Sequence, residues 1–319
     1  MKVRALLLAV VMAAVTLPAQ AATPVRIGVA YDIGGVGDQS FNDAAAAGLA
    51  QALKVTNIAV DVTVTDGTAA NREARIRSLM AKGANPIMAI GSGYAPTILK
   101  LSLEFPERQF AIMNDGSVDG VDVTSIVFGE VQGAFLAGTA AALSSRNGKV
   151  AMVALSSQKA MYEKGFAAGV GAAKKNAKPS VIYATSSLDG TKRALATGAD
   201  VIFVSIPGSV TDAFKEVVKS RSAGLITVAP DQYLTLTKGT KKYLYATVEK
   251  RVDLAMKEWV LATSRGEQFL DFINEDEGIY GRFYGINNGG VVISLLNPSL
   301  ASQSSTINQV AALIEKFHA

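Results

Sequence analysis

A regular alternation of short apolar strands with amphipathic helices, which runs through the chain twice, limits its fold most strongly. The first series starts with a strand at Val25–Tyr31 and a helix at Phe41–Leu53, and it ends with a strand at Phe110–Asn114. The second series runs from a helix at Val131–Ser144 to a strand at Leu225–Ala229. Such units form parallel sheets with helices on both faces and right-handed crossovers. We therefore expect an α/β fold of two Rossmann-like, doubly wound lobes with a ligand cleft between them.

The tail beyond Tyr243 does not add a third series of this kind. Its pattern predicts one long helix at about Ala246–Thr263, two extended stretches at Gly281–Ile286 and Val291–Leu295, and a last helix. A tail that recrosses between the lobes would account for this order. We expect residues 23–127 and 232–282 to form the first lobe, and residues 128–231 and 283–319 to form the second.

The N-terminus has the pattern of a secretory signal peptide over residues 1–22. Lys2 and Arg4 precede an apolar run that is too short to span a bilayer, and small residues mark a cleavage point near Ala21/Ala22. Without this peptide, 29 basic residues remain against 27 acidic ones, a net charge of +2. This surplus is too small to indicate nucleic acid or an anionic membrane as a partner. We expect an exported, periplasmic protein.

The chain contains no cysteine and one histidine. The lack of cysteine excludes disulfides, thiol catalysis, cysteine-ligated metals and an N-terminal lipid anchor. The histidine, His318, is next to the last residue, which is a poor place for a general base. We therefore expect no cofactor and no metal, and a binding protein rather than an enzyme.

A glycine-rich turn between the first strand and the first helix is the most specific local motif. Residues 35–40, GVGDQS, approximate the GxGxxG loop of dinucleotide sites. However, Asp32 and Asp38 flank the loop, and either carboxylate would repel a pyrophosphate at the helix N-terminus. A neutral polar ligand therefore fits this turn better than a phosphate.

The start of the first helix, SFND, predicts a capping box. Ser40 would be the N-cap, and the Asp43 carboxylate would accept the backbone N–H of Ser40. Phe41 follows at the first helical position, beside glycines that offer little surface for packing. It is either a locally packed side chain or a platform on which a flat ring stacks.

Beyond these local patterns, the chain resembles the basic membrane protein (Bmp) family of ABC-transporter substrate-binding proteins, in particular the purine nucleoside receptors. Two segments carry the resemblance most specifically: YDIGGVGDQSFNDAAAAGL at 31–49 and APDQYLTLTKGTKKYLYATVEKRVDLAM at 229–256. FGEVQGAFLAGTAAALSS at 128–145 supports it. The resemblance implies a type I periplasmic-binding fold that closes on its ligand by hinge motion.

The resemblance also implies a ligand site. Asp32 and Asn42 would bond a purine nucleoside from the first lobe, Phe41 would stack on its base, and Asp231 and Lys250 would contact its ribose hydroxyls. A carboxylate can accept both hydroxyls of a vicinal diol, and a neighbouring ammonium would offset the buried charge. The residues alone equally allow a turn role for Asp231 and a solvated helical position for Lys250.

The sequence departs from the pattern of its relatives at several positions. Asn114, followed by Asp115, replaces an aspartate that relatives direct at the base, and an amide both donates and accepts hydrogen bonds. No second aromatic residue that could sandwich the base is evident, since the position of Phe203 within an apolar strand predicts a core residue. Tyr94 is the candidate for additional stacking. We expect the rest of the site to consist of Asn114, Asp115, Gly91, Tyr94 and Gly208.

The sequence therefore predicts a monomeric periplasmic receptor that binds a purine nucleoside and delivers it to the permease and ATPase of an ABC importer. A nucleoside hydrolase remains an alternative, because two carboxylates such as Asp32 and Asp231 could cleave a glycosidic bond. A receptor for another ribosyl or sugar compound that feeds a membrane sensor is the other alternative. Release of free base would identify the hydrolase.

Overall fold

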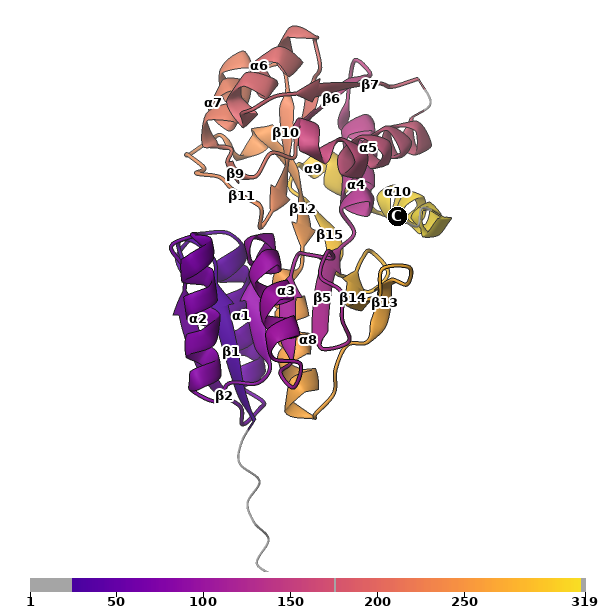
Figure 1. The fold of residues 1–319 in the computed structure, drawn as a ribbon. Coiled ribbons are helices and arrows are strands. Elements are labelled where there is room, and N and C mark those ends of the chain that lie inside the picture. The colour runs from indigo at the N-terminus through magenta and orange to yellow at the C-terminus, as the bar shows by residue number, and fades with distance from the viewer. Residues whose placement is uncertain (1–24, 175, 317–319) are drawn as a thin grey trace, which may run out of the picture.

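Two lobes, each built on its own sheet, stack on one another and are joined where several segments pass between them (Figure 1). The structure, a computed structural model, describes residues 25–174 and 176–316. The signal peptide expected at 1–22 and His318 lie outside the described residues. Among the described residues, no helix is both long and apolar enough to cross a membrane.

The lower lobe in Figure 1 contains a seven-stranded sheet of order β13-β14-β5-β4-β3-β1-β2. The strands are β1 (Arg26–Tyr31), β2 (Ala59–Val64), β3 (Ile87–Ile90), β4 (Phe110–Met113), β5 (Val123–Phe128), β13 (Asp271–Asn274) and β14 (Ile279–Tyr284). All neighbours are parallel except β13 and β14. The apolar clusters place α1 (Phe41–Leu53) with α8 (Val252–Ser264), and α2 (Ala69–Ala81) with α3 (Ala95–Glu104). These pairs cover the two faces of the sheet.

The upper lobe contains a six-stranded sheet of order β15-β12-β10-β8-β6-β7. The strands are β6 (Lys149–Ala154), β7 (Lys178–Tyr183), β8 (Val201–Val204), β10 (Gly224–Ala229), β12 (Leu244–Lys250) and β15 (Val291–Leu295). The helices are α4 (Glu130–Ser144), α5 (Lys159–Ala173), α6 (Ser187–Ala196), α7 (Thr211–Ser220), α9 (Pro298–Ala301) and α10 (Ser304–Ala311). Two short strands, β9 (Gly208–Ser209) and β11 (Gln232–Tyr233), pair beside the cleft.

Small residues allow α4 and α5 to approach unusually closely. A Cβ atom at Gly138 of α4 would collide with the carbonyl oxygen of Phe166, and one at Gly169 of α5 would collide with that of Phe135. Because glycine has no side chain, the two backbones come into contact along this face. The glycines of α4 and α5 therefore serve the close packing of these two helices.

The prediction of one long helix at Ala246–Thr263 is wrong. The chain instead forms β12, which ends at Lys250, and α8, which begins at Val252. Residues in β12 alternate between buried and half-buried, the period of a strand with one better-covered face. β12 lies between β10 and β15, so the expected unit 232–282 is divided between the two sheets. From sheet membership we propose that the lower lobe consists of 25–128 and 252–284, and the upper lobe of 130–250 and 291–316.

Within residues 25–174 and 176–316 the chain crosses between the sheets three times, and backbone hydrogen bonds connect these crossings. The N–H of Gly129, at the first crossing, donates to the carbonyl of Tyr284 over 2.9 Å. The N–H of Arg251, at the second, donates to the carbonyl of Gly290 over 2.8 Å. The crossings therefore form one compact hinge behind the cleft.

Candidate functional site

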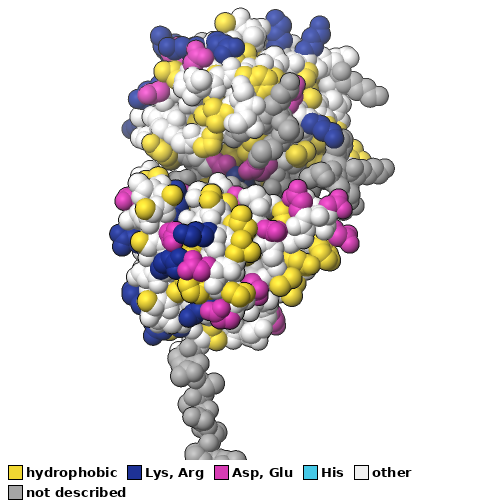
Figure 2. Space-filling model, viewed as in Figure 1, with side chains coloured by type: hydrophobic (Ala, Val, Ile, Leu, Met, Phe, Trp, Pro, Cys, Tyr) yellow, Lys and Arg dark blue, Asp and Glu magenta, His cyan; other side chains and the backbone are white. Residues whose placement is uncertain are grey.

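A cleft of about 640 Å³ lies between the lobes, beside the carboxyl ends of the parallel strands. This volume suits a small organic ligand, and strand ends are the usual ligand site of such sheets. Figure 2 shows acidic side chains in the groove that separates the lobes. The lining residues are Asp32, Ile33, Asp38, Ser40, Phe41, Asn42, Ile90, Gly91, Ser92 and Asn114 from the lower lobe, and Pro207, Gly208, Asp231 and Tyr233 from the upper lobe.

The turn before α1 is held by its own carboxylates. Asp38 accepts the backbone N–H groups of Ser40 at 2.8 Å and of Asn42 and Asp43 at 3.2 Å each. Asp43 accepts those of Gly37 at 2.5 Å and Gln39 at 2.9 Å. The donors that would bind a phosphate at a helix N-terminus are therefore already used, and the site suits a ligand without an anionic group.

The expected capping box is accordingly wrong in its details. Ser40 makes no side-chain cap, and its N–H binds Asp38 rather than Asp43. The hydroxyl of Ser40 instead donates to the carbonyl oxygen of Pro230 at 2.5 Å. Because Pro230 belongs to the upper lobe, this bond connects the two lips of the cleft, and the lobes are in contact in this conformation.

Asn42 and Asp32 are both engaged within the protein. The side-chain oxygen of Asn42 accepts the N–H of Asp32 at 3.0 Å, and its amide donates to the Asp38 carboxylate at 2.9 Å and to the carbonyl of Ile33 at 3.2 Å. Asp32 pairs with Arg72 at 2.8 Å. Asn42 therefore braces the turn, while Asp32, with a side chain 31% exposed, retains a surface toward the cleft.

Phe41 lies where the cleft meets the protein core. Its ring is half-buried and packs against the main apolar cluster. The ammonium of Lys250 is 5.1 Å from the centre of the ring, within the range of a cation–π contact. The ring is thus held in place from the core side, and the ring also lines the cleft.

Lys250 is the centre of a buried ionic cluster. Its ammonium is 2.7 Å from an oxygen of Asp231, 2.9 Å from one of Glu130 and 3.4 Å from the side-chain oxygen of Asn114. The side chains of Lys250 and Asp231 are only 3% and 7% exposed. Lys250 is the last residue of β12, not a solvated helical residue, and the three ionic groups carry a net charge of −1.

Burial and charge displace the pKa values of this cluster in defined directions. Burial raises the pKa of Asp231, with a further contribution from the charge of Glu130, although Lys250 opposes both. Burial lowers the pKa of Lys250, but the charges of Asp231 and Glu130 outweigh it, so that this pKa is raised. Burial and the same two carboxylates raise the pKa of Tyr162, which is buried beside them. Lys250 therefore stays charged at neutral pH.

Two oxygens of the cluster have no hydrogen-bond donor. One is Oδ1 of Asp231, and the other is Oε2 of Glu130, and both are buried. Buried carboxylate oxygens are normally paired, since an unpaired one loses its hydration without compensation. The cluster therefore offers two acceptors for hydroxyl or amine donors.

Asn114 and Asp115 are placed differently from one another. Asn114 lines the cleft at the end of β4 in a left-handed backbone conformation, with φ of 64°, which asparagine tolerates better than most residues. Asp115 lies in an adjoining hollow of about 390 Å³ that shares Ser92 and Asn114 with the cleft. There its carboxylate accepts the N–H of Ser117 at 2.8 Å and the hydroxyl at 2.6 Å, so it closes a turn.

Gly91 and Gly208 line the cleft with backbone from the two lobes. Both have positive φ values, 101° and 95°, which glycine adopts without strain. Tyr94 does not line the cleft. It is fully buried, and its hydroxyl donates to the carbonyl of Tyr31 at 2.9 Å, so its expected part in stacking is wrong. Phe203 is buried in the core, as expected.

Sequence reasoning missed several side chains at the site, among them Tyr233 in the cleft lining and two ion-pair partners, Glu130 and Arg72. Glu130 stands directly after Gly129 at the start of α4, and an acidic residue in a first helical turn is usually explained by the helix dipole alone. Arg72 lies in the first turn of α2, and nothing in the local sequence indicates that it pairs with Asp32. Tyr233, 40% exposed on the upper lip, follows Asp231 in a segment that reads as a loop.

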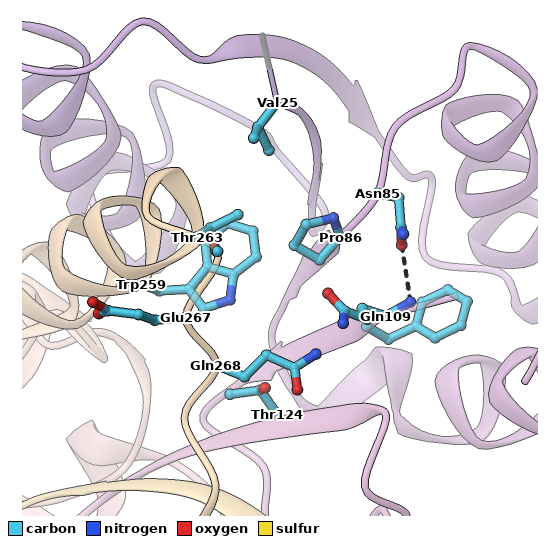
Figure 3. Close-up of a pocket in the computed structure, with 11 residues that line it drawn as sticks. Val25, Asn85, Pro86, Gln109, Thr124, Trp259, Thr263, Glu267 and Gln268 are labelled. Carbon is cyan, nitrogen blue, oxygen red and sulfur yellow. Dashed lines mark hydrogen bonds between the residues drawn. The ribbon is translucent and has the colours of Figure 1, made fainter. Parts of the chain in front are cut away.

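A second, smaller hollow of about 160 Å³ lies at the opposite end of the lower sheet. Figure 3 shows Trp259, Gln109 and Gln268 around it, with the N–H of Gln109 bonded to the side chain of Asn85 at 2.9 Å. It contains none of the expected site residues. The cleft between the lobes is therefore the candidate site.

Comparisons with known proteins agree with this geometry. Residues 25–316 match the Bmp family, described as ABC transporter substrate-binding protein, PnrA-like. The chain is 29% identical over 267 residues to a CD4+ T-cell-stimulating antigen of Listeria innocua, which covers 76% of this chain and 74% of that protein. It is 27% identical over 205 residues to the ABC transporter nucleoside-binding protein BmpA of Lactococcus lactis, covering 61% and 58% of the two chains.

Solved structures confirm the type I periplasmic-binding fold. A solute-binding protein of an ABC transporter from Conexibacter woesei superposes with a TM-score of 0.67 at 19% identity, covering 92% of this chain and 98% of that one. A dimeric Lac repressor superposes with a TM-score of 0.55 at 14% identity, covering 86% and 98%. At these identities the likeness concerns the fold alone.

The family match spans nearly all the described residues, and the resemblance seen in the sequence is confirmed. The two-lobed fold and the cleft at its strand ends are what a substrate-binding protein requires. Proteins of this kind act outside the cytoplasm and deliver a ligand to a transporter. The chain belongs to the Bmp family of PnrA-like ABC-transporter substrate-binding proteins.

Proposed function

We propose that this protein is a periplasmic, monomeric receptor that binds a purine nucleoside in the inter-lobe cleft and delivers it to the permease and ATPase of an ABC importer. The observation that carries the proposal is the buried Oδ1 of Asp231, an acceptor without a donor on the wall of the cleft. The hydroxyls of a ribose supply such donors.

The lower lobe supports the binding of a base. Phe41 lines the cleft and is fixed from behind by the core and by Lys250. A base stacked on an aromatic ring gains about 1–3 kcal/mol. The exposed carboxylate of Asp32 and the amide of Asn114, on the same wall, can accept from and donate to the edge of that base.

The charges of the site favour a nucleoside over a nucleotide. Asp38 and Asp43 already occupy the N–H donors of the turn, and the Lys250 cluster carries a net negative charge. A phosphate in this cleft would meet the carboxylates of Asp32, Asp38 and Asp231, and no lysine or arginine is among the described residues that line it. We therefore expect a neutral ligand.

Calorimetry with protein stripped of copurified compounds by unfolding and refolding tests this proposal. Inosine, guanosine and adenosine should bind, whereas ribose, hypoxanthine and inosine 5′-monophosphate should bind much more weakly. Equal affinities for ribose and inosine would exclude the nucleoside and point to a sugar receptor. Chromatography of the mixtures for free base would detect a nucleoside hydrolase.

A further inference from the structure

Glu130 occupies a special position, because it is the only residue of the ionic cluster that starts a helix directly at a crossing between the lobes. It follows Gly129, whose N–H is bonded to the third crossing at Tyr284. Lys250 ends β12 directly before the second crossing. The ion pair between Glu130 and Lys250 therefore joins two of the three hinge segments.

This placement distinguishes Glu130 from Asp231. Asp231 lies on the upper lobe, next to the Pro230 carbonyl that receives the hydroxyl of Ser40 from the lower lip. Glu130 and Lys250 belong to the upper lobe, as Asp231 does, and Glu130 lines the hollow that adjoins the cleft. The three ionic groups therefore keep their mutual positions when the lobes part, and Glu130 is the carboxylate next to the hinge.

One of the two carboxylate oxygens of Glu130 lacks a hydrogen-bond donor. Oε1 is paired with the ammonium of Lys250 at 2.9 Å, and Oε2 is buried without a donor. Asp231 repeats this arrangement, with one oxygen on the same ammonium at 2.7 Å and the other unpaired. Since one ammonium contacts both carboxylates, at 2.7 and 2.9 Å, the two groups are close neighbours, and two adjacent hydroxyls of one ligand can contact one carboxylate each.

We propose that Glu130 is a second hydroxyl acceptor of the ligand, so that the ribose diol binds Asp231 with one hydroxyl and Glu130 with the other. This inference rests on the proposed function and adds a specificity residue to it. The ammonium of Lys250 stays between the two carboxylates and pairs with one oxygen of each. Both unpaired oxygens are buried in this conformation, so the diol enters while the lobes are apart and then completes the cluster.

The test measures hydroxyl discrimination in the intact protein. Inosine, 2′-deoxyinosine, 3′-deoxyinosine and 2′,3′-dideoxyinosine are titrated into the wild type and into Glu130→Gln. Glutamine keeps the size of the side chain but has one acceptor and no charge. Glu249→Gln is the matched control, because Glu249 neighbours Lys250 in β12, has no ion pair with it, and bonds the hydroxyl of Ser294 instead.

In the wild type, each single deoxy ligand should bind about tenfold or more weakly than inosine, because charge-assisted hydrogen bonds are the strong ones. Glu130→Gln should lower the affinity for inosine about 10- to 100-fold and leave the affinity for the dideoxy ligand nearly unchanged. Glu249→Gln should leave both affinities unchanged. Equal losses for inosine and the dideoxy ligand would show that Glu130 only positions Lys250, and the proposal would be overturned.

The wild-type titrations keep the proposal falsifiable even if the variant does not fold. A wild type that loses affinity on removal of only one hydroxyl has only one hydroxyl acceptor, which also overturns the proposal. If the wild type binds inosine and Glu130→Gln binds it equally well, Glu130 does not contact the ligand. The proposed function as a nucleoside receptor is then unaffected. A wild type that binds none of the four compounds overturns the proposed function, and with it this inference.

Discussion

Removal of the ammonium at Lys250 is the most severe test of the ionic cluster. Lys250→Met keeps the apolar stem of the side chain and deletes its charge, which leaves the carboxylates of Asp231 and Glu130 buried beside each other without a cation. Loss of one partner of a buried ion pair costs about 3–5 kcal/mol, because the remaining charge is neither hydrated nor paired. For a chain of this size, that corresponds to a fall in melting temperature of about 10 °C.

The destabilisation should depend on pH in a direction that the cluster fixes. The pKa of Asp231 is already raised by burial above its ordinary 3.8, so the folded protein holds this proton to a higher pH than the unfolded chain does. Stability therefore falls as pH rises from that ordinary value through the folded-state pKa. Without Lys250 the folded-state pKa rises further, so the variant should lose less stability at pH 5 than at pH 7. Lys250, with its own pKa raised, is charged in both states at these pH values.

Urea denaturation at pH 5 and pH 7, followed by circular dichroism, measures both effects. Lys100→Met is the matched control, since Lys100 pairs with Glu73 at 2.8 Å, close to the 2.7 and 2.9 Å of the Lys250 pairs, but with a side chain 57% exposed. Exposed pairs contribute little to stability, so this variant should be nearly as stable as the wild type. If Lys250→Met costs no more than Lys100→Met, or if its cost is the same at both pH values, the charged cluster does not contribute as we have argued.

Three further substitutions address the ligand and the turn. Phe41→Ala should weaken inosine binding by about 1–3 kcal/mol in calorimetry, and an unchanged affinity would remove the stacking platform. Asn114→Asp should change the order of affinities for guanosine, inosine and adenosine, because a carboxylate only accepts; an unchanged order would show that Asn114 does not read the base. Asp38→Ala should lower the free energy of unfolding by about 1–2 kcal/mol, as measured in urea, since three backbone N–H groups lose their acceptor.

Much of the architecture follows from local patterns. The first series of strands and helices, from β1 to β4, could be predicted because each element has one dominant period and is bounded by glycine, proline or polar residues. The segment Leu244–Lys250 could not. It combines a strand of alternating burial with a helix directly behind it, and only Arg251 separates the two. From the sequence alone, the helical pattern that starts at Val252 also fits the residues of the preceding strand. The strand and the helix were therefore predicted as one helix.

The candidate site was predictable where a residue follows a strand end, and unpredictable where its partner comes from another lobe. Asp231 and Lys250 are placed by the strands β10 and β12 that precede or contain them; Asp231 lines the cleft and Lys250 pairs with it from behind, while their roles toward a ligand stay predictions. The prediction for Tyr94 is wrong because a residue four positions after a strand end can point outward or inward, and here its hydroxyl donates to the carbonyl of Tyr31. Nothing in the local sequence distinguishes these outcomes.

The arrangement around Lys250 also explains why a substrate-binding protein keeps an ionic cluster that costs free energy to bury. An isolated pair of Lys250 with Asp231 would balance its charges, and the desolvation of both would remain uncompensated. The additional carboxylate of Glu130 makes the cluster negative and leaves two acceptors open. In the proposed complex the hydroxyls of the ligand supply the hydrogen bonds that these two oxygens lack, and this gain in free energy favours the closed conformation.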